Sequence, residues 1–86
     1  MDQSFEQFKE RLDDTYQWPA TYTFKFVVPQ QKKGSLLSLV PMGDISERAS
    51  SSGKYVSLTI KSRMNSSDQV VDAYKKVSAL EGVITL

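Results

Sequence analysis

Two segments of the chain alternate between apolar and polar residues, which is the pattern of a half-buried β-strand. In residues 21–28, Tyr22, Phe24, Phe26 and Val28 fall on one side and Thr21, Thr23, Lys25 and Val27 on the other. In residues 54–63, Val56, Leu58 and Ile60 fall on one side and Tyr55, Ser57, Thr59, Lys61 and Arg63 on the other. We therefore expect two strands that turn an apolar row toward the core and a row rich in hydroxyl and cationic side chains outward.

The leading segment has the spacing of a helix instead. Its apolar residues recur at intervals of three and four: Phe5, Phe8 and Leu12. This spacing predicts an amphipathic helix over residues 4–14, with Ser4 and Gln7 as a capping box at its start. The helix must end before Trp18-Pro19, because proline lacks the N–H that a helix needs and restricts the residue before it to extended geometry.

Three shorter elements follow the first strand. Residues 30–34 read as a polar connection, and the leucine-rich residues 35–40, which Pro41 stops, predict a short helix. Residues 44–49 resemble the polar strand that is typical of a sheet edge, where charges discourage pairing with other chains. A Ser-Gly turn over residues 50–53 then leads into the second alternating strand.

The last third of the sequence predicts one more helix and a strand. Residues 65–68 begin the helix, with Ser66 and Gln69 as a second capping box. Its apolar stripe is Val70, Val71, Tyr74, Val77 and Leu80. Gly82 suits a left-handed position after the helix, and residues 83–86 predict the final strand.

This order of elements predicts the fold class, which is α+β. A βαββαβ series with right-handed crossovers gives a ferredoxin-like sandwich, with a four-stranded antiparallel sheet in the order 4-1-3-2 and two helices on one face. An extra helix precedes it. We expect a single domain over residues 1–86, in which residues 1–17 form the leading helix and its connection and residues 18–86 the ferredoxin-like core.

The composition narrows the chemistry that this fold can host. The 86 residues include 11 Lys and Arg, 10 Asp and Glu, and neither Cys nor His, with a net charge of +1. Disulfides, thiolate and imidazole chemistry and nearly every zinc, haem or copper site are thereby excluded, and we expect no metal and no cofactor. The sequence carries no apolar run of the roughly 20 residues that span a bilayer, and it begins with acidic and polar residues. We expect a cytoplasmic protein without a membrane partner.

Several motifs together resemble one known family. They are Trp18-Pro19, Tyr22-x-Phe24-Lys25-Phe26, Ser51-Ser52-Gly53-Lys54-Tyr55-x-Ser57-x-Thr59, Val70-x-x-x-Tyr74 and Gly82-Val83-Ile84-Thr85-Leu86. From about Phe5 to the end, the sequence resembles the YbeD-like family of small bacterial proteins of unknown function. The resemblance implies a ferredoxin-like fold similar to that of ACT regulatory domains, and a link to lipoate metabolism has been proposed for the family. The ACT ligand loop usually has an acidic residue before its glycine, whereas Lys33 precedes Gly34 here.

Two surfaces are candidates for binding. Lys32, Lys33, Gly34 and Ser35 stand at the start of the short helix, where free N–H groups and two cations can hold a phosphate or carboxylate; the competing interpretation is a solvated loop. The open sheet face carries Lys25, Tyr55, Lys61 and Arg63. A nucleic-acid-binding sheet of this topology needs two or three outward aromatic residues on its central strands, and this face offers one.

Catalysis finds little support in the sequence. Asp13 and Asp14 are adjacent in a helix and point about 100° apart, so they read as surface charges and not as an acid–base pair. Acyl-phosphate hydrolysis on this fold resembles anion capture by an arginine after the first strand, with an asparagine that positions water. Lysines stand there instead, and Asn65 falls beyond the third strand.

We therefore expect no enzyme, but a regulatory or adaptor domain, ACT-like, that binds a small polar ligand or a protein partner and forms a homo-oligomer. Residues 44–49 and the leading helix are the expected contact surfaces, since the apolar stripe of that helix needs cover from this chain or another. The alternative is a nucleic-acid-binding module that uses the basic open sheet face.

Overall fold

The two alternating segments form the centre of one antiparallel sheet. The computed structural model describes residues 3–41 and 43–86, with side chains from Phe5 onward. β1 (Ala20–Pro29) pairs with β3 (Tyr55–Met64) along its whole length. β2 (Asp44–Ala49) lies outside β3, and β4 (Ile84–Thr85) lies outside β1, so the sheet order is β2-β3-β1-β4. The predicted order is confirmed.

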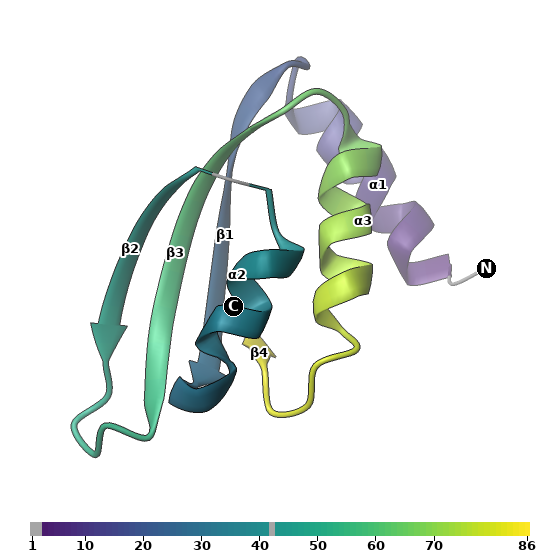
Figure 1. The fold of residues 1–86 in the computed structure, drawn as a ribbon. Coiled ribbons are helices and arrows are strands. Elements are labelled where there is room, and N and C mark those ends of the chain that lie inside the picture. The colour runs from purple at the N-terminus through teal and green to yellow at the C-terminus, as the bar shows by residue number, and fades with distance from the viewer. Residues whose placement is uncertain (1–2, 42) are drawn as a thin grey trace.

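The helices gather on one side of this sheet. α2 (Lys33–Leu39) follows a single 3₁₀ turn, η1 (Gln30–Lys32), and α3 (Ser67–Val77) follows β3. The extra N-terminal helix is α1 (Gln3–Thr15). Figure 1 shows α2 and α3 in front of the sheet, with α1 beside α3. The α+β ferredoxin-like architecture with an added helix is therefore confirmed.

The core lies between the sheet and the helices, where the alternation places it. Phe24, Phe26 and Val28 of β1 are completely buried, as are their neighbours on β3. The helices add Leu12, Leu36, Val70, Val71, Ala73 and Val77. The expected burial of the aromatic row is confirmed, although Tyr22, at the end of the row, stays half-buried.

The short helix starts earlier than the leucine pattern predicts. The η1 turn runs directly into it, because the Lys33 N–H donates to the Gln30 carbonyl oxygen in a 3₁₀ bond. Lys33 and Gly34 are thus helical, and the predicted polar connection over residues 30–34 is wrong.

The start of α3 is capped largely as the sequence predicts. The Ser66 Oγ accepts a hydrogen bond from the Gln69 N–H at 3.4 Å. The Gln69 Oε1, however, accepts from the Asn65 N–H at 2.8 Å, and not from the Ser66 N–H as in a standard capping box. The other predicted capping box depends on the Ser4 side chain, which lies outside the described residues.

The chain after α3 departs most from the prediction. Leu80 does not extend the helical stripe, because i→i−3 bonds from the Ala79 and Leu80 N–H groups tighten the backbone into turns beyond Val77. Gly82 takes the predicted left-handed conformation, with φ of 80°. The final strand covers Ile84–Thr85 alone, half of the predicted span. Among the described residues, no helix is long and apolar enough to cross a bilayer.

Candidate functional site

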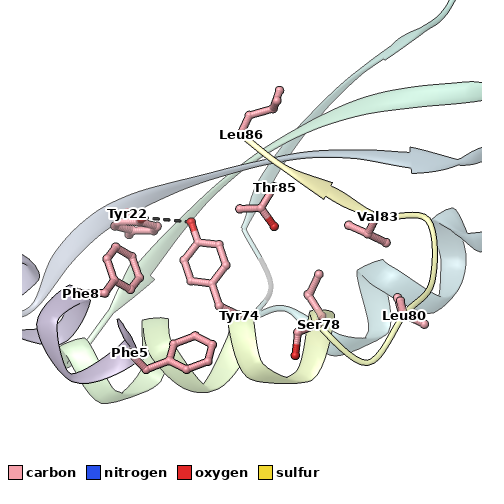
Figure 2. Close-up of a pocket in the computed structure, with 10 residues that line it drawn as sticks. Phe5, Phe8, Tyr22, Tyr74, Ser78, Leu80, Val83, Thr85 and Leu86 are labelled. Atoms are coloured by element: carbon pink, nitrogen blue, oxygen red, sulfur yellow. Dashed lines mark hydrogen bonds between the residues drawn. The ribbon is translucent and has the colours of Figure 1, made fainter. Parts of the chain in front are cut away.

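A groove of about 590 Å³ lies at the edge of the sheet where β4 is short. Side chains from α1, β1, α3 and the chain around β4 surround it (Figure 2). The lining residues are Phe5, Phe8, Tyr22, Tyr74, Val77, Ser78, Leu80, Val83, Thr85 and Leu86. None of these side chains is charged at neutral pH, so the groove favours apolar and aromatic ligand groups.

Tyr74 is the centre of the aromatic cluster in this groove. Its ring centroid lies 5.4 Å from that of Phe8 and 5.3 Å from that of Phe24, and Tyr22 meets it edge to face at 6.2 Å. Such offset and edge-to-face contacts each add about 0.5–1.5 kcal/mol beyond simple burial. Rings from α1, α3 and β1 therefore hold one another in place, and this wall of the groove is preformed.

Two tyrosine hydroxyl groups in the groove form a hydrogen-bonded pair. The Tyr22 and Tyr74 Oη atoms are hydrogen-bonded at 3.0 Å, as the dashed line in Figure 2 shows. Burial raises the pKa of Tyr74, and the hydrogen bond with Tyr22 raises it further. The phenol is therefore neutral at physiological pH and offers a ligand a hydroxyl group without charge.

The rim supplies a few further groups that can orient a ligand. Ser78 and Thr85 contribute hydroxyl groups, and the Lys75 Nζ lies 5.4 Å from the centre of the Phe5 ring in a cation–π contact. Among the described residues, no Asp or Glu side chain lines the groove to activate one of the hydroxyls as a nucleophile. The arrangement can bind and orient a ligand.

The predicted anion loop has partners within the chain. The Lys32 Nζ donates to the Glu81 carbonyl oxygen at 2.9 Å, and the Lys33 Nζ forms an ion pair with the Glu47 carboxylate at 2.8 Å. Gly34 and Ser35 are exposed beside them. The structure therefore directs the two ammonium groups to different partners, one near β4 and one on β2.

The cations predicted for the open sheet face lie close together on neighbouring strands. Lys61 lies opposite Thr23 and Arg63 opposite Thr21, while Lys25 is the diagonal neighbour of Lys61. All three cations are exposed. Tyr55 is exposed on the same face but stands opposite Pro29, at the far end of the strand pair. The cations form one group, and the aromatic ring is separate from it.

The aspartate pair of α1 is an exposed structural feature, as the sequence predicts. The Asp13 carboxylate accepts from the Trp18 Nε1–H at 3.0 Å and from the Lys9 Nζ at 3.2 Å. Hydrogen bonds from Ser67 and Trp18, followed by that from Lys9, hold the pKa of Asp13 below its ordinary value. Asp13 thus ties α1 to the start of α3 and to the chain that enters β1.

The sequence does not predict the groove, because its walls come from both ends of the chain. One signal was present: the apolar stripe of the leading helix needed cover. The chain itself provides part of it, since Leu12 is buried and Phe8 packs on Tyr74. No sequence pattern indicates that β4 would be short enough to leave the groove open.

Comparisons with known proteins identify the family of this chain. The model of a family described as "Protein of unknown function (DUF493)" matches residues 13–86, which include all four strands. A UPF0250 protein of Shewanella piezotolerans (strain WP3 / JCM 13877) is 31% identical over 80 residues, covering 85% of this chain and 91% of that protein. The comparison with solved structures gave no significant match. These matches confirm the resemblance to the YbeD-like proteins: the chain belongs to the DUF493 family, whose function is unknown.

Proposed function

We propose that the protein is a non-catalytic adaptor or regulatory domain that acts by binding apolar groups of a partner in the groove between α1, α3, β1 and β4. The observation that carries the proposal is the preformed aromatic wall around Tyr74, which faces a groove of about 590 Å³ whose described lining residues carry no charged side chain. Grooves of this size and lining are typical of binding sites.

The hydroxyl groups support a binding role over a chemical one. The Tyr22 and Tyr74 phenols are hydrogen-bonded to each other, and burial raises the pKa of Tyr74, which disfavours its use as a base near neutral pH. Such a pair can donate or accept one further hydrogen bond, which would fix the orientation of a bound group.

An NMR titration with indole, a neutral aromatic probe, tests this proposal. We expect the largest amide shifts at Tyr22, Tyr74 and Val83. Ser78→Phe places a ring in the groove and should abolish these shifts, whereas Ala79→Phe adds the same ring to an exposed neighbour that does not line the groove. Indole shifts that are scattered over the surface, or equal in the two variants, would refute the proposal.

The alternative function is binding of single-stranded nucleic acid by the open sheet face. The grouping of Lys25, Lys61 and Arg63 favours it, because phosphate contacts need clustered cations. The separation of Tyr55 from these cations argues against base stacking beside them. Filter binding of single-stranded RNA at two salt concentrations tests it: salt-sensitive retention supports this function, and no retention at low salt eliminates it.

A further inference from the structure

On the side where β4 lies, half of β1 pairs with no strand of the described residues. β4 pairs with Phe26 and Val27, and the Leu86 N–H donates to the Lys25 carbonyl oxygen at 3.0 Å. From Ala20 to Phe24, no strand of the described residues pairs with this side of β1. The backbone groups of alternate residues point the same way, so the N–H and C=O groups of Thr21 and Thr23 face outward like those of Lys25.

The groove lies next to this free edge, on the helix side of the sheet. Tyr22 lines the groove, and Phe24 packs against Tyr22 and Tyr74 behind it. A strand added here would send the side chains opposite Tyr22 and Phe24 toward the helices. These positions of an incoming segment therefore require apolar side chains.

The opposite side of the same edge has a different character. Side chains of an added strand opposite Thr21 and Thr23 would emerge on the open sheet face. There, β1 carries Lys25 and β3 carries Lys61 and Arg63, while Asp44 of β2 lies opposite Lys61 on the side away from this edge. Lys25 would be the diagonal neighbour of the position opposite Thr23, which is within reach of a long side chain. These positions therefore favour Asp or Glu.

We propose that this edge receives an extended segment of a partner protein in which apolar and acidic residues alternate. The segment continues the line of β4, antiparallel to β1, with its apolar side chains in the groove and its acidic side chains beside the cations. Backbone hydrogen bonds to Thr21 and Thr23 supply affinity, and the two sets of side chains supply specificity. This inference rests on the proposed function and names the class of partner.

A different protein fits this edge better than a second copy of the chain. Pairing two β1 edges would bring the Lys25, Lys61 and Arg63 groups of both copies onto one continuous open face. A second β1 strand would place no acidic residue next to Lys25, because β1 carries none. An acidic partner strand gains from the same charges.

The experiment is an NMR titration with the peptide acetyl-Leu-Glu-Phe-Glu-Leu-amide. We expect the largest shifts at the Thr21 and Thr23 amides, together with Tyr22 and Tyr74. Two control peptides keep the length: acetyl-Leu-Phe-Leu-Glu-Glu-amide breaks the alternation, and acetyl-Leu-Lys-Phe-Lys-Leu-amide reverses the charge. Both should bind more weakly than the test peptide by about fivefold or more, as the loss of cross-strand pairs predicts.

Charge variants test the proposed register. Lys25→Glu should weaken binding of the acidic peptide and strengthen binding of the lysine peptide. Lys54→Glu makes the same charge change at an exposed site outside this edge and should alter the binding of neither peptide. Both variants lie on the surface, and circular dichroism verifies that they fold.

The outcomes separate this inference from the proposed function. If indole binds in the groove but the acidic peptide leaves Thr21 and Thr23 unshifted, the inference fails and the proposed function stands. If neither probe binds, both fail. Equal binding of the scrambled peptide, peptide shifts confined to β2, or concentration-dependent broadening at Thr21 and Thr23 without peptide, which would indicate a second copy, would each overturn the inference.

Discussion

The two edges of the sheet present similar backbones to a strand of another chain, but their side chains are very different. At the β2 edge all six residues are exposed, three of them are charged, and Glu47 forms an ion pair with Lys33. At the β1 edge, the free half is flanked by an aromatic groove on the helix side. Charges on an edge strand discourage pairing with other chains. An unpaired backbone therefore does not by itself identify a docking edge; the side chains beside it decide.

One row of paired residues crosses the sheet from β1 to β2. Substitutions in this row should have the largest effect on the free energy of unfolding. Phe24 on β1 lies opposite Ile60 on β3, which lies opposite Ile45 on β2. Phe24 is completely buried, whereas Ile45 is 48% exposed. Phe24→Ala should lower the free energy of unfolding by about 3–5 kcal/mol. Ile45→Ala should lower it by about 1 kcal/mol, because half of its surface is already in water. Urea denaturation measures both, and equal losses would contradict the difference between the edges.

Substitutions of two glycines on the β2 side of the molecule should have the next largest effect on stability. A Cβ on Gly43, just before β2, would collide with the Lys61 carbonyl oxygen of β3, so Gly43→Ala should destabilise the protein by about 1–3 kcal/mol. Gly34 in α2 has open space around it, and Gly34→Ala should stabilise by about 0.5–1 kcal/mol, because alanine favours the helix. Thermal unfolding compares them. A neutral Gly43→Ala would show that β2 is held less closely than the structure indicates.

The tyrosine pair sharpens the description of the β1 edge. Tyr22→Phe removes one partner of the hydrogen bond and should cost about 0.5–1.5 kcal/mol at pH 7. A double-mutant cycle with Tyr74→Phe isolates the pair, because Tyr74→Phe in the Tyr22→Phe background should then cost less than in the wild type. Equal costs in the two backgrounds would mean that the hydroxyl groups are not coupled.

Alkaline pH tests the same pair in another way. The pKa of Tyr74 is raised in the folded state above its ordinary value of 10.0, so the unfolded chain releases this proton first as the pH rises. The stability associated with the neutral phenol is present below pH 10 and is lost progressively above it. Tyr74→Phe should reduce this loss of stability. Urea denaturation between pH 9 and pH 11, about one unit on either side of the ordinary tyrosine pKa, measures it. An unchanged slope would contradict the burial of the phenol.

The smallest effect concerns the fastening of α1, which forms the outer wall of the groove. Because the pKa of Asp13 is lowered in the folded state, its contribution to stability is present above the ordinary pKa of 3.8 and is lost as the pH falls through the folded value. Asp13→Asn should therefore be less stable than Asp14→Asn at pH 7, and the difference should vanish in acid. Asp14 is the matched control, since no ion pair of the described residues includes it. A difference that persists unchanged in acid would contradict this role.

The sequence predicts those parts of the molecule that depend on local periodicity. The alternation around Phe24 and Leu58 places both central strands, and their burial follows from it. Ser66 marks the start of α3 because its cap involves a residue only three positions away. The start of α2 is less predictable. A 3₁₀ turn has i→i−3 hydrogen bonds and an α-helix has i→i−4 bonds, and the spacing of apolar residues does not distinguish the two.

The groove could not be predicted because its formation depends on distant contacts. Phe8 meets Tyr74 across 66 positions of sequence, and the length of β4 follows from turns that i→i−3 bonds set after Val77. The open-face cations were predictable as a set, because Lys25, Lys61 and Arg63 each occupy outward positions of an alternating strand. Their position beside a free edge was not, since it depends on β4.

Native-state amide hydrogen exchange tests most directly that β1 has a free, receptive half. Amide exchange should alternate along β1: the Tyr22 and Phe24 amides, which face β3, exchange slowly, while the Thr21 and Thr23 amides, which face the groove edge, exchange fast. Slow exchange at Thr21 and Thr23, equal to that of Tyr22 and Phe24, would show that this edge is already covered and that β1 has no free half.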